Sequence, residues 1–206
     1  MTRKKIAAAA VAGLLGVSAV VAAQDAKQKA SSPAKDVMSV IFARKSVRKY
    51  QDKPVSKASL ELLMKAGMAA PTAADKRPWA FVAVTDKKQL AAVAEALPYG
   101  KMIGKAGAAI AVCGVEDRFF PGAEREFWVQ DLSAASQNIL LAAEGEGLGA
   151  VWIGVYPDKA RVAAVSKALG LPAGVIPLNV ISIGYPIGGE KPKNKFDPKN
   201  IHWEKW

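Results

Sequence analysis

The stretch from Glu124 to Glu144 is the part of the sequence that most limits how this chain can fold. Its apolar side chains lie around most of a helical circumference: Phe127, Trp128, Val129, Leu132, Ile139, Leu140 and Leu141. A helix that is apolar all round is buried on several sides. In a chain of 206 residues, the size of one ordinary domain, we therefore expect a central core helix or a helix at a subunit interface. The glycines at 145, 147 and 149 should end it.

Strands and further helices are expected on both sides of this stretch. Apolar runs of strand length lie at 80–85, 108–115, 150–155 and 178–184. Helical patterns lie at 36–44, at 87–96, at 159–169, and in a segment that Ser56 caps and that stops before Pro71. The alternation by itself favours a doubly wound parallel sheet. Cys113, in the middle of an apolar run, is expected to be a buried and inert thiol.

The first 23 residues have the pattern of a secretory signal peptide. A basic start, Arg3-Lys4-Lys5, precedes an Ala-rich apolar run and the small residues Val21-Ala22-Ala23. The alternative is an uncleaved membrane anchor, because the run approaches spanning length. Its many alanines favour export with cleavage, to the bacterial periplasm or another extracytoplasmic compartment, without a stable membrane anchor. Residues 24–35 are expected to form a flexible polar leader before a domain at 36–206.

The charge of the chain narrows the class of partner. Lys and Arg number 29 against 18 Asp and Glu, for a net charge of +11. The cations do not form one dominant stripe, so a nucleic-acid partner is not expected. Much of the positive charge lies instead in 27–57 and 191–205. His202 is the only histidine and receives no role, and no metal-ligand cluster or catalytic acid–base constellation is expected.

Two short segments carry the clearest chemistry. Arg44-Lys45-Ser46-Val47-Arg48-Lys49-Tyr50 places four cations around Ser46. The segment 70–81 begins as a Pro-bounded turn and leads into an aromatic-rich strand. Cations and a hydroxyl are the groups that hold an anion, and the turn with its strand suits a flat aromatic ring. Together the segments indicate a bound flavin.

These segments resemble the N-terminal signature of the FMN-dependent nitroreductase family. The resemblance continues in family order through Gly147–Gly154, Ile183–Pro186 and Lys191–Phe196, and covers roughly residues 36–206. It implies an α+β fold, a nitroreductase-like central mixed β-sheet flanked by helices. It also implies an entwined homodimer with FMN at the interface. This expectation differs from the parallel sheet that the alternation favours.

The resemblance implies FMN contacts at named positions. The family's phosphate and ribityl contacts match Arg44, Ser46, Lys193 and Lys195. Arg48 matches a cation near the pyrimidine edge, and Lys45 contributes through its backbone or stem. Taken separately, the first two cations could be a solvated helix end and the last two a solvated tail. Their occurrence together favours a site.

The implied contacts to the ring come from two other segments. Pro71, Thr72 and Ala73 match a turn that approaches the ring from the partner subunit, and the strand beside flavin N5 matches Trp152, Ile153 and Gly154. Trp152 is equally compatible with a core position. The chain has Asp75 and Arg77 where many members have Asn and Gln. An ionised Asp only accepts hydrogen bonds, so Asp75 could accept from flavin N3–H, and Arg77 could supply the lost donor or pair with Asp75.

The resemblance implies hydride transfer from a reduced donor, NAD(P)H, to nitroaromatic, quinone or similar electron-poor acceptors. Such chemistry belongs to the cofactor and needs no catalytic side chain. The alternative is an exported flavin-binding electron-transfer protein without NAD(P)H turnover, since free NAD(P)H is not expected outside the cytoplasm. Reductive dehalogenation is a further alternative, and only 98–105 and 116–123 offer a lid for it.

Overall fold

A four-stranded sheet lies at the centre of residues 36–206, the part of the chain that the computed structural model describes. The strands β1 (Trp79–Val84), β2 (Ala108–Val115), β4 (Val175–Gly184) and β3 (Gly149–Gly154) are hydrogen-bonded in that order, each pair antiparallel. A parallel bridge between Ser46 and Ala150 makes the sheet mixed. The parallel sheet favoured by the alternation is wrong, and the mixed sheet implied by the resemblance is confirmed.

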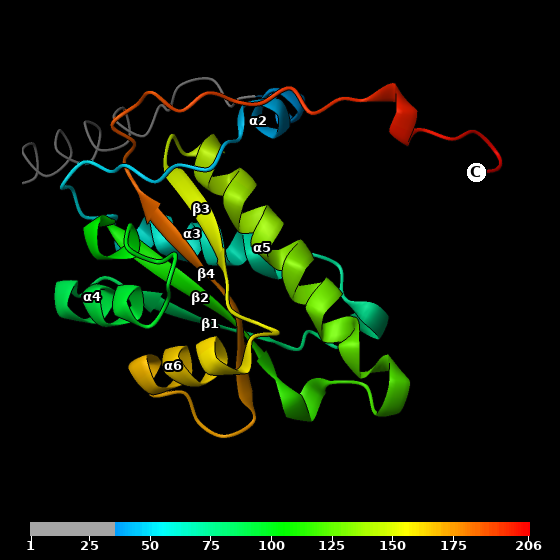
Figure 1. Cartoon of the computed structure of the whole chain (residues 1–206), viewed down its shortest axis with the longest axis horizontal. Coiled ribbons are helices and arrows are strands. Elements are labelled where there is room, and N and C mark those ends of the chain that lie inside the picture. The colour runs from blue at the N-terminus through cyan, green and yellow to red at the C-terminus, as the bar shows by residue number, and fades with distance from the viewer. Residues whose placement is uncertain (1–35) are drawn as a thin grey trace, which may run out of the picture. The chain divides into compact units, whose positions relative to one another are not determined.

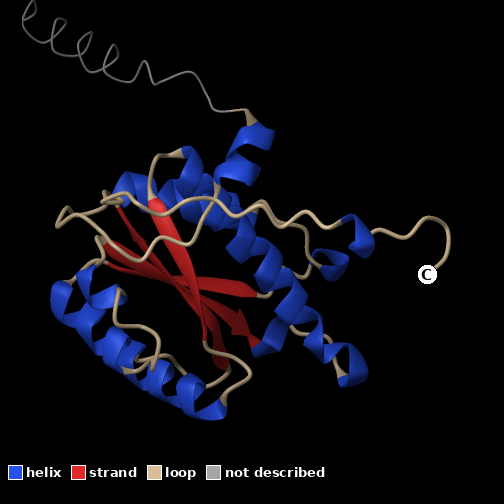
Figure 2. Ribbon diagram, turned by 45° about the horizontal axis from the view of Figure 1, so that its top comes forward, coloured by secondary structure: helices blue, strands red, loops and turns tan. Residues whose placement is uncertain are grey.

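Helices cover both faces of the sheet (Figures 1 and 2). On one face lie α3 (Lys57–Met68) and α5 (Phe127–Gly145), and on the other α4 (Lys87–Glu95) and α6 (Lys159–Leu169). Alternate residues of β2 divide between the two layers, because successive side chains of a strand point to opposite faces. Ile110 and Val112 belong to the core with α3 and α5, whereas Ala111 and Cys113 belong to the core with α4 and α6.

The helix α2 (Val37–Ala43) differs from these four because it buries no residue within the chain. Its apolar side chains Val37 and Phe42 are about 70% exposed. The remaining elements are short 3₁₀ turns: η1 (Ala73–Asp75), η2 (Ile103–Lys105), η3 (Glu116–Arg118), η4 (Gly122–Glu126) and η5 (Pro198–Asn200). The signal peptide expected at 1–23 and the leader expected at 24–35 lie outside the described residues.

The expected core helix is present as α5, with a shifted start. Residues 122–126 form the 3₁₀ turn η4, and the α-helix begins at Phe127 and ends at Gly145. One face is fully buried, including Trp128, Leu132 and Ile139. Burial of each such side chain stabilises the fold by about 1.5–3 kcal/mol. The left-handed Gly147 (φ +73°) follows the helix end, as its position in the sequence predicts.

Local sequence signals explain the other helix boundaries. Ser56 caps α3, and its hydroxyl accepts a 3.0 Å hydrogen bond from the amide of Ser59.

Cys113 is fully buried, and burial raises the pKa of its thiol to about 12, so the expected inert thiol is confirmed. No helix within residues 36–206 is long and apolar enough to cross a bilayer. The same residues contain no group of three or more His, Cys, Asp or Glu arranged to hold a metal ion.

Candidate functional site

The cationic segment 44–50 lies against the ends of β3 and β4. The amide of Val47 donates to the carbonyl of Ala150 at 3.0 Å. The hydroxyl of Tyr50 donates to the carbonyl of Val47 at 2.6 Å and also lies 3.2 Å from the carbonyl of Ser182. Burial raises the pKa of Tyr50 to about 12, so it is a neutral donor at every physiological pH. The segment is therefore held at both ends by the sheet.

Two glycines make this close approach possible. A Cβ at position 149 would lie 2.6 Å from Cγ1 of Val47, and one at position 184 would lie 2.8 Å from Cδ1 of Tyr50. Both distances are too short for real contacts. Gly184 would be taken for a turn glycine from the sequence, but it is a strand residue that leaves room for the tyrosine ring. Gly188 and Gly189, a few residues further on, have a positive φ, at +105° and +97°.

The C-terminal segment returns along the same cationic segment. The amide of Gln51 donates to the carbonyl of Tyr185 at 2.8 Å, and the amide of Ile187 donates to the carbonyl of Lys49 at 3.2 Å. These bonds align 185–187 with 49–51. Residues 190–196 consequently lie beside residues 41–48, although the two segments are far apart in the sequence.

A cavity of about 930 Å³ lies between the two segments, within the range of about 300–1,000 Å³ that small-molecule sites occupy. Its lining consists of Ile41, Phe42, Arg44, Lys45, Ser46, Arg48, Glu190, Lys191, Pro192, Lys193, Asn194, Lys195 and Phe196. Six of these residues are cationic and one is acidic. All six residues predicted from the cationic segment and the C-terminal lysines therefore line one cavity. A set of Arg, Lys and hydroxyl donors fits a phosphate dianion.

Glu190 is a carboxylate within this cationic cavity that the sequence analysis missed. Its Oε1 accepts from the backbone amide of Arg48 at 3.3 Å. Burial opposes its ionisation, but hydrogen bonds from the amides of Arg48, Glu190 and Lys49, with the charge of Lys49, lower its pKa overall. The ionised group therefore fastens the C-terminal segment to the segment that carries Arg48. Nothing in its sequence position, next to a run of lysines, distinguishes it from a solvated acid.

Lys45 has a partner of its own on α5. Its Nζ lies 3.3 Å from Oε2 of Glu144, and both side chains are largely shielded from solvent. The ammonium group is thus engaged by a carboxylate, while the stem of the side chain lines the cavity. This arrangement agrees with a contribution through stem or backbone rather than through the charge.

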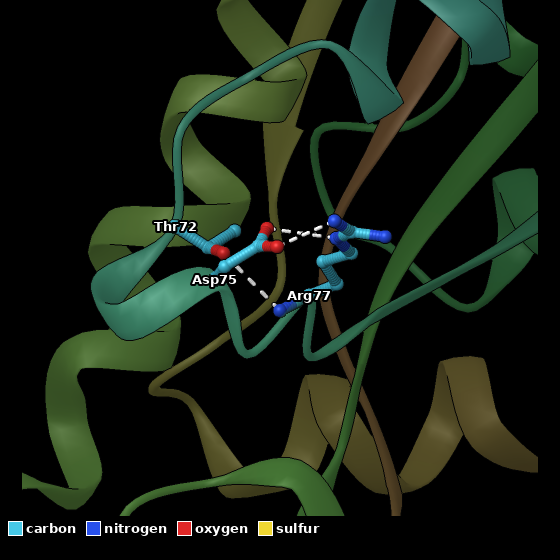
Figure 3. A network of polar contacts seen from close by, with 3 residues as sticks. All are labelled: Thr72, Asp75 and Arg77. Atoms are coloured by element: carbon cyan, nitrogen blue, oxygen red, sulfur yellow. Dashed lines mark hydrogen bonds and ion pairs between the residues drawn. The ribbon is translucent and has the colours of Figure 1, made fainter.

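The turn between α3 and β1 forms a second cluster of predicted residues (Figure 3). Thr72 Oγ1 accepts from the amide of Arg77 at 3.1 Å, and the Arg77 guanidinium pairs with both carboxylate oxygens of Asp75, with Nε 2.7 Å from Oδ1. The hydrogen bond from Arg77 lowers the pKa of Asp75. Arg77 was expected either to supply a donor to the flavin or to pair with Asp75, and the structure shows the pair.

Three residues of this turn have a strained backbone. Ala74, Asp75 and Arg77 have φ of +45°, +53° and +48°, the left-handed region that costs a residue with a Cβ about 1–2 kcal/mol. Such conformations persist where surrounding contacts over-determine them, and they cluster at binding sites. A carboxylate on α5 supplies one of these contacts: Oδ1 of the buried Asp131 accepts from the amide of Ala73 at 2.9 Å.

Asp131 was not predicted as a site residue, although its position in the sequence carries a signal. It stands in register with Trp128 and Leu132 on the buried face of α5, where an acid is out of place. Burial raises the pKa of its carboxyl, and the hydrogen bond from Ala73 partly offsets that effect.

The predicted residues of β3 occupy the end of that strand. Trp152 is half-buried against the core of α3 and α5, and Ile153 is buried. Gly154 is exposed, and a Cβ added there would meet no atom within 4 Å. The face of β3 on which a side chain of residue 154 would lie is therefore free for a ligand, and Trp152 serves the core as its alternative interpretation states.

The structure does not bring all fourteen predicted residues into one place. Neither the turn Pro71–Arg77 nor the strand end Trp152–Gly154 lines the cationic cavity. One chain thus presents a cationic cavity, an unobstructed glycine at the end of β3 and a strained turn as separate features. These features define the class of the protein: an α+β protein whose cationic cavity suits a phosphate-bearing cofactor.

Comparison with known proteins identifies the family. The nitroreductase family model matches residues 41–101 and 95–185, so the chain belongs to the nitroreductase family. A relative from Methanothermobacter thermautotrophicus, which carries the provisional name NADH dehydrogenase/NAD(P)H nitroreductase, is 45% identical over 83% of this chain and 88% of its own length. A crystal structure from Parabacteroides distasonis with the same provisional name has 48% identity and a TM-score of 0.78, over 84% of this chain and 99% of that one. An FMN-dependent nitroreductase from Clostridium difficile has 28% identity and a TM-score of 0.75, over 82% of this chain and 99% of that one.

Proposed function

We propose that this protein reduces nitroaromatics, quinones or similar electron-poor rings. Its class is established by the family: it is an FMN-dependent oxidoreductase, and NAD(P)H is the donor that the names of its relatives suggest. The observation that carries the proposal is the cationic cavity between the segment at 44–48 and the C-terminal lysines. Bound FMN supplies the hydride chemistry, so the chain needs to bind and orient rather than to provide a nucleophile.

In this proposal each group of predicted residues has one task. Arg44, Ser46, Lys193 and Lys195 hold the phosphate and ribityl chain, because all four line one cavity and carry hydrogen-bond donors. Arg48 lines the same cavity and acts on the pyrimidine edge as a fixed cation. The free space at Gly154, which has no side chain, allows the ring to approach the backbone of β3. Pro71, Thr72, Ala73, Asp75 and Arg77 complete the site from a partner subunit.

We infer a homodimer from surfaces that the chain leaves uncovered. The helix α2 exposes Met38 and Phe42, and the C-terminal segment exposes Phe196 and Trp203, with exposed fractions of 51%, 69%, 72% and 79%. Figure 1 shows that segment extending away from the sheet beyond η5. Apolar side chains grouped in this way mark interaction surfaces. A second copy would cover them and bring its turn 71–77 to the open site.

Light scattering and reconstitution with FMN test these proposals together. The purified protein should have twice the mass of one chain and hold one FMN per chain. A colourless protein that takes up no FMN on reconstitution would contradict the flavin site. A monomer that binds and turns over FMN normally would contradict only the shared site.

The acceptor and donor are tested by kinetics. Reduction of the bound flavin by NADH and NADPH should be followed by reoxidation with nitroaromatics and quinones in a panel that includes dioxygen as a reference. Rapid reoxidation by the electron-poor rings supports the proposed substrate class. Reoxidation by none of them would remove that class while leaving the FMN site intact.

The N-terminal sequence favours a second candidate, an exported electron-transfer flavoprotein without NAD(P)H turnover. We propose export to the periplasm because residues 1–23 have the signal-peptide pattern. N-terminal sequencing of protein from cell fractions should place the mature start near residue 24. Stopped-flow mixing separates the two candidates: flavin that both nicotinamides fail to reduce, but that a protein or membrane donor reduces, favours the second.

A further inference from the structure

The turn 71–77 has a strained backbone, and several of its hydrogen bonds do not connect it to the rest of the domain. Ala74, Asp75 and Arg77 all have left-handed backbones that residues with a Cβ avoid. Two of the contacts described above, Thr72 with Arg77 and Asp75 with Arg77, connect the turn only to itself. A turn held by internal bonds can still move as a unit, so its position must be fixed by a contact to the body of the domain.

Asp131 supplies such a contact from α5, a helix of 19 residues with one buried face. It lies on the buried face of α5 and is 6% exposed, and its Oδ1 accepts from the amide of Ala73 at 2.9 Å. No ion pair to Asp131 is found in the described part of the chain, where pairs occur at other acids. A buried carboxylate without a cation is costly. An apolar residue at this register position would pack with less cost, so the carboxylate is explained by the bond that it makes.

We propose that Asp131 is a positioning residue of the flavin site, which holds the turn 71–77 against α5 through the amide of Ala73 and so fixes the strained residues Ala74, Asp75 and Arg77 toward the ring. The proposal rests on the proposed function, because the family resemblance is what directs this turn to a flavin. The anchoring itself is a property of the chain without cofactor. It can therefore be tested separately.

The chain offers well-matched variants for this test. Asp131→Ala removes the acceptor, whereas Asp131→Asn keeps an oxygen that can accept from Ala73 and removes only the charge. Asn138→Ala is the control, because Asn138 lies on the same helix and donates to the carbonyl of Ala66 on α3 at 3.0 Å. It removes a helix-to-neighbour hydrogen bond of the same kind without touching the turn. Asp131→Ser, whose hydroxyl bonds back to its own helix, replaces the alanine variant if that variant does not fold.

Cofactor-free protein gives the first readout. Lys76 is exposed within the turn, so trypsin cleavage after Lys76 and hydrogen exchange of residues 71–77 report its mobility. Loss of one hydrogen bond of about 1.4 kcal/mol corresponds to a tenfold change in an opening equilibrium. We expect about tenfold faster cleavage and exchange in Asp131→Ala, with Asp131→Asn and Asn138→Ala close to wild type. Equal protection of the turn in Asp131→Ala and wild type overturns the proposal.

FMN binding gives the second readout. The FMN dissociation constant should rise about tenfold in Asp131→Ala and be restored in Asp131→Asn, which a general loss of stability would not produce. Loosening of the turn without any change in FMN affinity overturns its role toward the ring. If wild-type protein takes up no FMN, the proposed function fails, whereas cleavage in the cofactor-free protein still decides whether Asp131 anchors the turn.

Discussion

Ser46 forms a parallel bridge with Ala150, and this contact joins the cationic segment to the strand that ends at Gly154. The neighbouring amide of Val47 donates to the carbonyl of the same alanine at 3.0 Å. FMN would contact the cationic segment through its phosphate and the end of β3 through its ring, so these two segments must lie at a fixed separation. The bridge sets that separation through the backbone, so it does not depend on flexible cationic side chains.

Tyr50→Phe should destabilise the protein because it removes the hydroxyl that holds the cationic segment. The buried group donates to the carbonyl of Val47, which would be left without that partner. We expect a loss of about 1–2 kcal/mol, or roughly 2–8 °C in melting temperature for a domain of this size. Thermal unfolding measures it. Tyr99→Phe is the control, since Tyr99 is 73% exposed; an equal loss there would contradict the role assigned to Tyr50.

Much of the architecture is predictable from local pattern. The run 108–115 and the helix 159–169 have the predicted bounds, because alternation and caps such as Asp158 act within a few residues. Strand order is not local: the neighbours β2 and β4 are separated in the sequence by residues 116–174, which include α5, β3 and α6. Family resemblance supplied the mixed sheet where periodicity favoured the wrong one.

The candidate site likewise contains residues that could be predicted from the sequence and residues that could not. The cations at 44–48 and 193–195 could be predicted as a group, because a motif identifies them and the return of the C-terminal segment brings them together. Glu190 and Asp131 could not, since each acts by accepting from a backbone amide of another segment. The sequence does not reveal which backbone amide an acid accepts from. An acid on the buried face of α5 does indicate, however, that the residue has a specific partner.

Gly154→Ala should leave stability unchanged and weaken FMN binding. A methyl group at this position meets no protein atom within 4 Å, so only a ligand lying against β3 would feel it. Contact with a rigid ring is expected to raise the FMN dissociation constant about tenfold, the effect of roughly 1.4 kcal/mol. Flavin fluorescence titration and thermal unfolding give both quantities. Gly104→Ala, on η2, controls for the substitution itself; unaltered FMN affinity in Gly154→Ala would place the ring elsewhere.

Lys195→Ala should weaken FMN far more than riboflavin, which has no phosphate. A charge-assisted contact to phosphate contributes about 1.5–3 kcal/mol, a factor of roughly ten to a hundred in affinity. Titration with both flavins isolates the phosphate contribution. Lys199→Ala is the matched control, because Lys199 belongs to η5 and does not line the cavity. Equal losses for FMN and riboflavin would show that the C-terminal lysines are only solvated.

Asp131→Asn should change how stability depends on pH. Burial raises the pKa of Asp131 above its ordinary value of 3.8, so the folded protein binds this proton more tightly than the unfolded chain. As pH rises from 3.8 through the folded pKa, the carboxyl therefore costs the folded state stability. The asparagine variant lacks this cost, so its unfolding free energy relative to wild type should increase across that interval and level off above it. Denaturant unfolding at several pH values measures it; a difference independent of pH would contradict the raised pKa.

Arg48→Ala should lower the reduction potential of the bound flavin. The side chain lines the cavity next to Glu190, while its amide is held by the Glu190 carboxylate, so truncation removes the guanidinium and leaves the backbone anchored. A fixed cation stabilises the negative charge that the pyrimidine edge gains on reduction. Loss of about 1.4–2.8 kcal/mol corresponds to roughly 30–60 mV for a two-electron couple. Arg48→Lys keeps a cation and should recover most of the shift. Spectroelectrochemical titration measures both variants, and a potential equal to wild type in Arg48→Ala would remove Arg48 from the ring side of the site.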